Sequence, residues 1–130
     1  MSRKQSREKA FQLLFSLCFG AEVGTGLDMV TDEKPDEKEL VFINKLCAVV
    51  SENLGEIDAK ISTHAHGFAL DRIFKIDLTV LRMAVGEVMY LDTPDAVAVN
   101  EAVNIAKKYG TEKSGGYVNG ILASILKEKK

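Results

Sequence analysis

Cations, glycines, an aromatic ring and an amide stand close together in the segment at residues 99–122, VNEAVNIAKKYGTEKSGGYVNGIL. Lys107 and Lys108 come before its glycines, and Tyr117 and Asn119 come after them. Lysines bind phosphates, while aromatic rings and amides bind unstacked bases. The segment therefore carries chemistry for binding a nucleic acid more than for catalysis. The alternative is that Tyr117 is a core residue and that the lysines form a solvated face.

A second group of cations, Arg3, Lys4 and Arg7, lies at the start of the chain. At about 100° per residue, Arg3 and Arg7 fall on the apolar side of a helix predicted over residues 2–19, with Lys4 at its margin. Cations that only solvate a helix would favour the opposite side, which carries glutamine and serine. This placement favours a binding role, and a frayed basic N-terminus is the alternative.

The net charge of −2 argues against a general nucleic-acid binder, but the charges are unevenly distributed. Residues 1–19 contain four cations and one acid, and residues 107–130 contain six lysines and two acids. Residues 20–39, with seven acids and two lysines, compensate for them. If the two basic ends meet in the folded protein, they form a local basic patch.

Signatures of catalysis are mostly absent from the sequence. It contains no phosphate-binding glycine loop, no dinucleotide fingerprint and no nucleophile elbow. Cys18, Cys47, His64 and His66 could supply a zinc site, but both cysteines fall on apolar faces of predicted helices, which favours buried thiols. The two histidines are interpreted as an exposed helix end. We therefore expect neither an enzyme nor a cofactor or metal.

Length and composition predict a single all-α domain over residues 1–130. The chain has 46% hydrophobic and 28% charged residues, as an ordinary globular protein does. We find no membrane-spanning apolar run and no secretory signal, and the two cysteines suggest a reducing compartment. These features predict a cytoplasmic protein.

Apolar residues recur at helical spacing through most of the chain. Residues 20–35 contain three glycines, one proline and several acids, and are predicted to form a loop. The helix predicted over residues 78–91 is apolar around about half its circumference, which places it at the centre of a bundle. The other predictions are Asp77 as the cap of this helix, a helix at residues 36–53 capped by Asp36, a helix at residues 56–66, and one turn at residues 70–74.

The segment with the two lysines is predicted to form a pair of packed helices. Asn100 is the expected cap of the first helix, after an extended stretch at residues 96–99, and Gly110 ends it. Ser114 is the expected cap of the second helix. Lys107 and Lys108 would then lie opposite the apolar stripe, beside the loop.

Four segments have an order and spacing that resemble the NusB family of transcription antitermination factors: RKQSREKAFQLLFS, RIFKIDLTVLRMAVGEV, PDAVAVNEAVNIAKKYG and GGYVNGIL. The resemblance spans nearly the whole chain. It implies about seven helices in two small packed bundles, and no enzymatic activity. It also implies binding of boxA RNA in nascent ribosomal transcripts together with the ribosomal protein NusE, in an antitermination complex that helps RNA polymerase read through terminators.

The resemblance also implies roles for individual residues. The family's basic start contacts RNA, its FVNG motif presents an aromatic ring at the position of Tyr117, and Lys75 lies near the same surface. With the residues singled out above, the expected RNA-binding set is Arg3, Lys4, Arg7, Lys75, Lys107, Lys108, Tyr117 and Asn119. The positions that resemble the family's NusE-contacting side are Phe15, Asp71 and Asp77.

The chain departs from the family's pattern at six positions, where relatives carry basic, aromatic or larger polar residues: Gln5, Gly86, Asp95, Ala96, Gly115 and Gly116. Fewer cations mean fewer phosphate contacts, which implies weaker RNA binding alone and more dependence on NusE. One alternative is a NusB-like protein-interaction module whose RNA contacts have decayed. Another is the RNA-binding domain of an rRNA methyltransferase. Both a monomer and a homodimer remain open for the free protein.

Overall fold

The computed structural model describes residues 1–20, 35–66 and 69–129, so the loop predicted at residues 20–35 lies almost entirely outside the described residues. The described residues contain helices and no strand, which confirms the all-α prediction. None of these helices is long and apolar enough to cross a membrane. In chain order the elements are α1 (Arg3–Leu14), the 3-10 helix η1 (Phe15–Phe19), α3 (Glu37–Glu52), α4 (Leu54–His64), the 3-10 helix η2 (Leu70–Arg72), α5 (Lys75–Tyr90), α6 (Asp95–Tyr109) and α7 (Ser114–Lys129).

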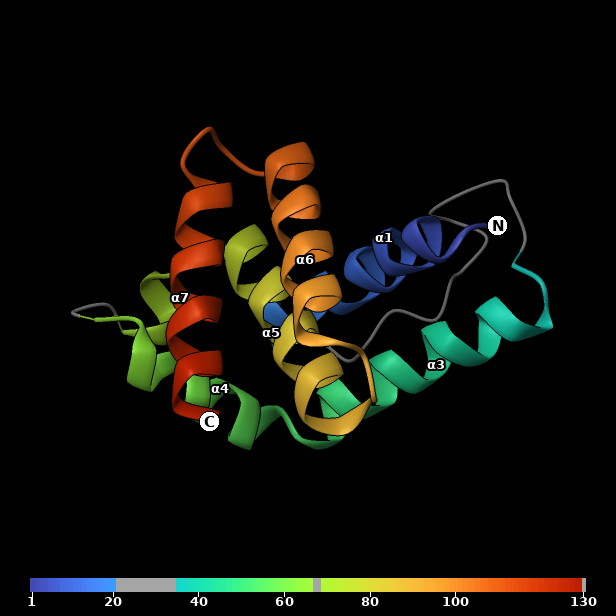
Figure 1. The fold of residues 1–130 in the computed structure, drawn as a ribbon, viewed down its shortest axis with the longest axis horizontal. Helices are drawn as coiled ribbons and strands as arrows, with labels where there is room; N and C mark the ends of the chain where they lie inside the picture. Colours follow the sequence, from blue (N-terminus) through green and yellow to red (C-terminus); the bar gives the residue numbers. More distant parts are fainter. Residues whose placement is uncertain (21–34, 67–68, 130) are drawn as a thin grey trace.

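The central helix is α5, as its wide apolar face predicted. It contacts α1, η1, α3, α4, α6 and α7, and all of its residues from Asp77 to Glu87 are buried. Figure 1 shows α1 and α3 together to the right of α5. It shows α7 to the left of α5 and α6 in front of it, and α6 and α7 pack against each other. One continuous cluster of buried apolar side chains joins these two groups of helices.

Two helices begin earlier than predicted. α6 starts at Asp95, so residues 96–99 are helical instead of extended, and Asn100 is not a cap. Pro94 starts this helix because it has no N–H to satisfy and its carbonyl accepts the Ala98 N–H at 3.0 Å. α5 begins at Lys75, which places Asp77 inside the first turn and not at the cap.

The helix predicted over residues 2–19 is divided in two. It is α-helical to Leu14, tightens into η1, and ends at Gly20, whose φ of 74° is a left-handed conformation that favours glycine. At its start, the Ser2 hydroxyl accepts the Gln5 N–H at 3.1 Å, and the Gln5 side chain accepts the Ser2 N–H at 2.8 Å. Gln5, a departure from the family's pattern, thus completes a capping box for α1.

The two remaining predicted caps have different outcomes. The cap at Asp36 is confirmed, because its carboxylate accepts the Glu39 N–H at 2.9 Å. The cap predicted at Ser114 is off by one position, since this buried residue is already the first residue of α7. Its hydroxyl accepts the Thr111 N–H at 2.9 Å and therefore closes the α6–α7 loop.

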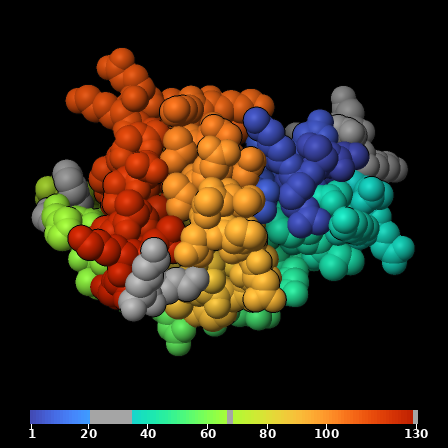
Figure 2. All heavy atoms as spheres, viewed as in Figure 1, coloured from blue at the N-terminus to red at the C-terminus, as the bar shows by residue number. Residues whose placement is uncertain are grey.

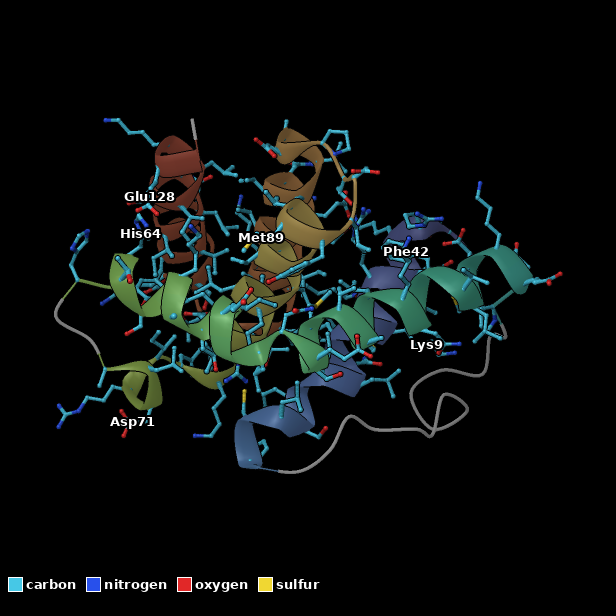
Figure 3. The ribbon with its side chains drawn as sticks, turned by 90° about the horizontal axis from the view of Figure 1, so that it is seen from below. Lys9, Phe42, His64, Asp71, Met89 and Glu128 are labelled. Carbon is cyan, nitrogen blue, oxygen red and sulfur yellow. The ribbon has the colours of Figure 1, made fainter. Side chains whose placement is uncertain are left out.

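The cysteines and histidines do not form a common cluster, and no group in the described part of the chain could hold a metal ion. The prediction of buried thiols is confirmed for Cys47, where burial raises the pKa of the thiol to about 12, but Cys18 is only partly buried. The prediction that the histidines form an exposed helix end is wrong for His64. Its ring is buried between α4 and α7, 2.6 Å from Ser124 Oγ and 2.8 Å from Glu128 Oε2 (Figure 3).

Gly86 allows α3 and α5 to approach each other closely. A Cβ atom at this position would lie 2.9 Å from a methyl carbon of Val50, which is fully buried on α3. A β-branched side chain in a close-packed core cannot easily move away from such a contact. The absence of a side chain at residue 86 is therefore a packing requirement of this chain.

We expect Gly86→Ala to lower the free energy of unfolding by about 1–3 kcal/mol, because the added methyl group overpacks the contact with Val50. Gly120→Ala is the matched control, since Gly120 lies on α7 with open space around an added Cβ. Alanine there should stabilise the protein by up to about 1 kcal/mol. Urea unfolding followed by circular dichroism measures both variants. Equal effects would contradict the packing argument.

Candidate nucleic-acid interface

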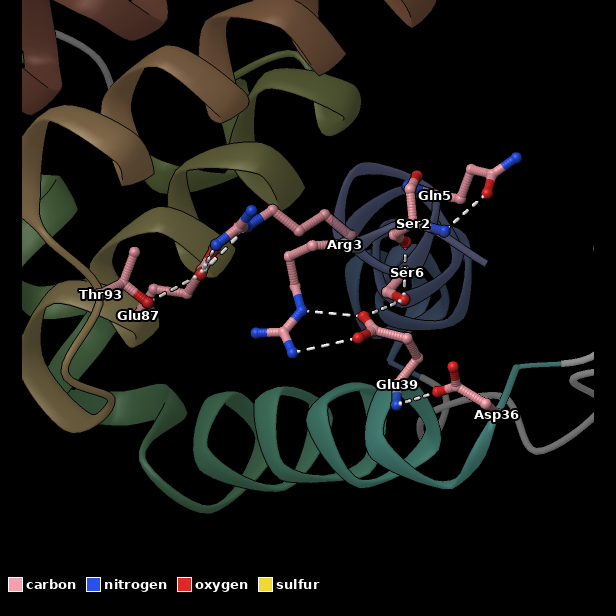
Figure 4. A network of polar contacts seen from close by, with 9 residues as sticks. Ser2, Arg3, Gln5, Ser6, Asp36, Glu39, Glu87 and Thr93 are labelled. Atoms are coloured by element: carbon pink, nitrogen blue, oxygen red, sulfur yellow. Dashed lines mark hydrogen bonds and ion pairs between the residues drawn. The ribbon is translucent and has the colours of Figure 1, made fainter.

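Arg7 is buried, and it joins α1 to α5. Its Nη2 lies 2.8 Å from Glu87 Oε1, and its Nε lies 3.1 Å from both carboxylate oxygens. The Thr93 hydroxyl donates to the same carboxylate at 3.0 Å (Figure 4). The side chains of Arg7 and Glu87 are 7% and 3% exposed. In this structure the guanidinium of Arg7 is thus occupied within the protein and does not face solvent.

The burial of this ion pair predicts a stability effect. We expect Arg7→Ala to lower the free energy of unfolding by about 3–5 kcal/mol, because it leaves Glu87 buried without its partner. Lys4→Ala, three residues earlier and exposed, should change it by less than about 0.5 kcal/mol. Denaturant unfolding of both variants measures the difference. A mild effect of Arg7→Ala would show that water reaches Glu87 readily.

Arg3 faces α3 and is partly exposed, at 39% of its side chain. Its Nε and Nη2 donate to Glu39 at 2.8 and 3.2 Å (Figure 4). Its guanidinium lies 4.0 Å from the ring centre of Phe42. The hydrogen bonds from Arg3 and from Ser6 lower the pKa of Glu39 to about 2. Arg3 is therefore a fixed cation whose charge is largely balanced by Glu39.

The low pKa of Glu39 predicts a stability that depends on pH. Its ordinary value is 4.5, so the carboxylate contributes fully above about pH 4.5 and loses its contribution as the pH falls towards about 2. We expect Glu39→Gln to be less stable than the natural protein at neutral pH, by a margin that shrinks over this range. Thermal unfolding at a series of pH values tests this. A margin that does not change with pH would contradict it.

The exposed lysines of the two basic ends meet around a hollow between α1 and α6. This α1–α6 hollow has a volume of about 350 Å³ and is lined by Lys4, Glu8, Asn104, Ile105, Lys107 and Lys108. Figure 2 shows α1 lying directly against the upper part of α6 on this face. The two basic ends of the sequence therefore form a common surface.

Glu8 holds one wall of the α1–α6 hollow in place. Its Oε1 accepts from Lys108 Nζ at 2.6 Å and from the Tyr109 hydroxyl at 2.7 Å. Burial acts to raise the pKa of Glu8, but the hydrogen bonds from Lys108 and Tyr109 outweigh it and keep the pKa below its ordinary value. The carboxylate is therefore ionised at neutral pH, and it fixes Lys108 at the rim.

Lys107 lies across the start of α7. A Cβ atom at Gly115 would lie 3.0 Å from Lys107 Cγ and 3.1 Å from its Cε, so the lysine chain runs over the glycine. Lys107 is exposed and forms no ion pair with any residue that the structure describes. Gly115 thus contributes no side chain to the surface, but the absence of a side chain there makes room for Lys107.

Tyr117 and Asn119 lie on α7 and do not line the α1–α6 hollow. Tyr117 is half-buried and packs against the core, and burial together with the nearby Asp77 raises the pKa of its hydroxyl. Asn119 is exposed. The side chain of Tyr117 therefore packs against the core and is also partly exposed, whereas that of Asn119 lies at the surface.

Lys75 lines a different hollow from Lys107 and Lys108. This second hollow, of about 420 Å³, lies at the start of α5 and is lined by Leu17, Cys18, Leu70, Asp71, Ile73, Lys75, Leu78 and Arg82. Lys75 Nζ lies 5.6 Å from the ring centre of Phe19, which is 63% exposed. Lys75 thus belongs to the surface that carries Asp71, one of the predicted protein-contacting residues.

The other two predicted protein-contacting residues differ in exposure. Phe15 is half-buried in η1, and its ring centre lies 5.3 Å from that of Phe19. Asp77 is buried at 6% exposure, and burial raises the pKa of its carboxyl group. Phe15 and Asp71 are therefore reachable from outside, whereas the structure does not bring Asp77 to the surface.

Two polar residues of the α1–α6 hollow, Glu8 and Asn104, are missing from the predicted set. The signal was present in their spacing: Glu8 follows Lys4 by four residues, and Asn104 precedes Lys107 by three. Both spacings place side chains on one face of a helix.

The fold is that of known transcription antitermination factors. A structure of NusB from T. maritima matches with a TM-score of 0.89 and 36% identity, covering 98% of this chain and 92% of that one. A structure of the antitermination factors NusB and NusE in complex with double-stranded RNA matches with a TM-score of 0.85 and 28% identity, covering 97% and 96% of the two chains.

Comparisons of the sequence indicate the same class of protein as the fold does. The family model described as the NusB family matches residues 4–127. The transcription antitermination protein NusB of Oceanobacillus iheyensis is 42% identical over 128 residues, which cover 97% of this chain and 99% of that protein. NusB of Agathobacter rectalis is 38% identical over 95% of this chain and 98% of the relative. The chain belongs to the NusB family.

Proposed function

We propose that this protein is a transcription antitermination factor that binds boxA RNA together with NusE, and that it performs no catalysis itself. Its membership of the NusB family and its likeness to a NusB chain in a complex with NusE and RNA support this role. In this role it works in the cytoplasm, as part of an antitermination complex with RNA polymerase.

The observation that carries the RNA-binding role is the α1–α6 hollow. Lys4 comes from one basic end of the sequence and Lys107 and Lys108 from the other, yet all three line one depression. The protein as a whole is slightly acidic, with a net charge of −2. A gathering of lysines against that background supports local binding of phosphates, which need cations at the surface. Of the other predicted contacts, we assign Arg3, Tyr117 and Asn119 to the border of this RNA surface. Arg7 is paired with Glu87, and Lys75 lines the second hollow.

We place NusE at the second hollow. Asp71 and Lys75 offer charges of both signs there, and the exposed rings of Phe19 and Phe74 add apolar area near the start of α5. Phe15 lies beside Phe19 in the same group of aromatic rings. Exposed aromatic rings with charged neighbours are typical of protein interfaces. The same exposed rings would also allow a homodimer in the absence of NusE.

A second candidate function is a protein-interaction module with little RNA binding. The observation that favours it is that both arginines form ion pairs within the protein. Arg3 is paired with Glu39, and Arg7 is buried and paired with Glu87. Only the lysines then remain for phosphates, which makes the contribution of NusE to RNA binding larger. The two functions differ in how RNA affinity depends on salt and on NusE.

We expect boxA RNA to bind with an affinity that falls steeply between about 50 and about 200 mM salt, since each phosphate contact releases counterions. Lys107→Ala should weaken binding and reduce the slope of log affinity against log salt by about 0.7, the value for one contact to a single strand. Lys45→Ala, an exposed lysine on α3, is the matched control and should leave the slope unchanged. Fluorescence anisotropy with labelled RNA, with and without NusE, measures both.

Two results would contradict the proposed function. Absence of RNA binding even with NusE present would favour the interaction module. Equal effects of Lys107→Ala and Lys45→Ala would show that the RNA-binding surface lies elsewhere.

A further inference from the structure

We propose that the α1–α6 hollow is a base-reading site, in which Glu8 and Asn104 hydrogen-bond the edge of one unstacked RNA base and select guanine. This inference rests on the proposed RNA-binding function and names the part of the RNA that the hollow takes. The lysines at the rim hold phosphates, whereas the two other polar side chains meet the base.

The composition of the hollow does not fit a phosphate site alone. Glu8 is ionised there, and its side chain is 15% exposed to the hollow and the solvent around it. A carboxylate repels a phosphate oxygen, so a site built only for phosphates would not place one among three lysines. A carboxylate accepts hydrogen bonds, and the N–H groups of nucleobases are the donors that RNA offers.

The acceptor of Glu8 is positioned in advance. Both internal hydrogen bonds, from Lys108 and from Tyr109, go to Oε1. Oε2 accepts no hydrogen bond from any residue that the structure describes. It is not among the buried polar atoms that lack a partner, so it is accessible from outside the protein. One oxygen therefore fixes the side chain while the other is left for a ligand. Fixing a side chain before binding lowers the entropy cost of the contact.

Asn104 provides the second polar group. It lies on α6 one turn before Lys107 and Lys108, it is half-buried, and its amide makes no hydrogen bond within the described part of the chain. An amide both donates and accepts, so it can pair with a base edge that carries both kinds of group. Ile105, buried at 4% exposure, adds an apolar surface to the same hollow.

Guanine fits this set of groups best. Its Watson–Crick edge has two adjacent donors, the N1–H and the N2 amine, next to the O6 acceptor. The donors match the Oε2 atom of Glu8, and O6 matches the amide of Asn104 or a lysine at the rim. Uracil presents carbonyl oxygens on both sides of its single N–H, which the carboxylate would repel. The volume of about 350 Å³ lies at the lower end of the range of about 300–1,000 Å³ for small-ligand pockets.

The experiment replaces single guanines of boxA RNA by inosine, which lacks only the N2 amine, and measures binding by the full chain with NusE. We expect one position at which inosine weakens binding by about tenfold, in line with the loss of one charge-assisted hydrogen bond. Glu8→Gln keeps one oxygen for Lys108 and Tyr109 but puts an NH₂ group in place of Oε2. This variant should therefore bind the guanine and inosine RNAs equally.

Asn104→Ala is the second variant, because it breaks no internal hydrogen bond that could affect folding. It should reduce discrimination between guanine and uridine at the same position. Lys4→Ala is the control, and it should weaken binding of all these RNAs by a common factor.

The outcomes separate the two proposals. If Glu8→Gln and Asn104→Ala lower the affinity for every RNA by a common factor, as Lys4→Ala does, the base-reading site is wrong and the RNA-binding function stands. If the natural protein shows no preference between guanine and inosine at any position, the site is likewise wrong. If no RNA binds even with NusE, the proposed function fails and the base-reading site fails with it.

Discussion

The buried ion pair between Arg7 and Glu87 fixes the first helix against the central one, and the geometry of the binding surface depends on it. Charges this deeply buried are costly unless each has a partner, so the pair strongly disfavours any other placement of α1. The hydroxyl of Thr93 binds the same carboxylate and adds the connection between α5 and α6. Lys4 and Glu8 lie on either side of Arg7 along α1, so this pair also positions them opposite α6.

The cations of the chain divide by residue type. The two arginines near the N-terminus form bidentate pairs with glutamates, for which the planar guanidinium is well suited. The exposed positions around the α1–α6 hollow are lysines, whose hydrated ammonium groups favour solvent. A basic stretch that looks uniform in the sequence thus contains residues that hold the fold together and residues that face outward.

Features that depend on neighbours in the sequence could be predicted, and features that depend on distant partners could not. Patterns within single helices predict the central position of α5, the cap at Asp36, and the exposure of Lys107 and Lys108. The burial of Arg7 depends on a glutamate 80 residues away, and that of His64 on Glu128, 64 residues away. Local spacing could place Glu8 beside Lys4 and Asn104 beside Lys107, but it could not show that α1 and α6 bring the two pairs together at one hollow.

The contact between Lys107 and Gly115 has a consequence for the entropy of binding. A lysine on an open surface samples many rotamers, and ordering it costs up to about 2 kcal/mol. Here the backbone of α7 supports the methylene groups of Lys107, so folding has already restricted part of that motion. A charge restricted in this way loses less freedom when it meets a phosphate. A glycine in a neighbouring helix can therefore offset part of the loss of a cation by making the remaining one less mobile.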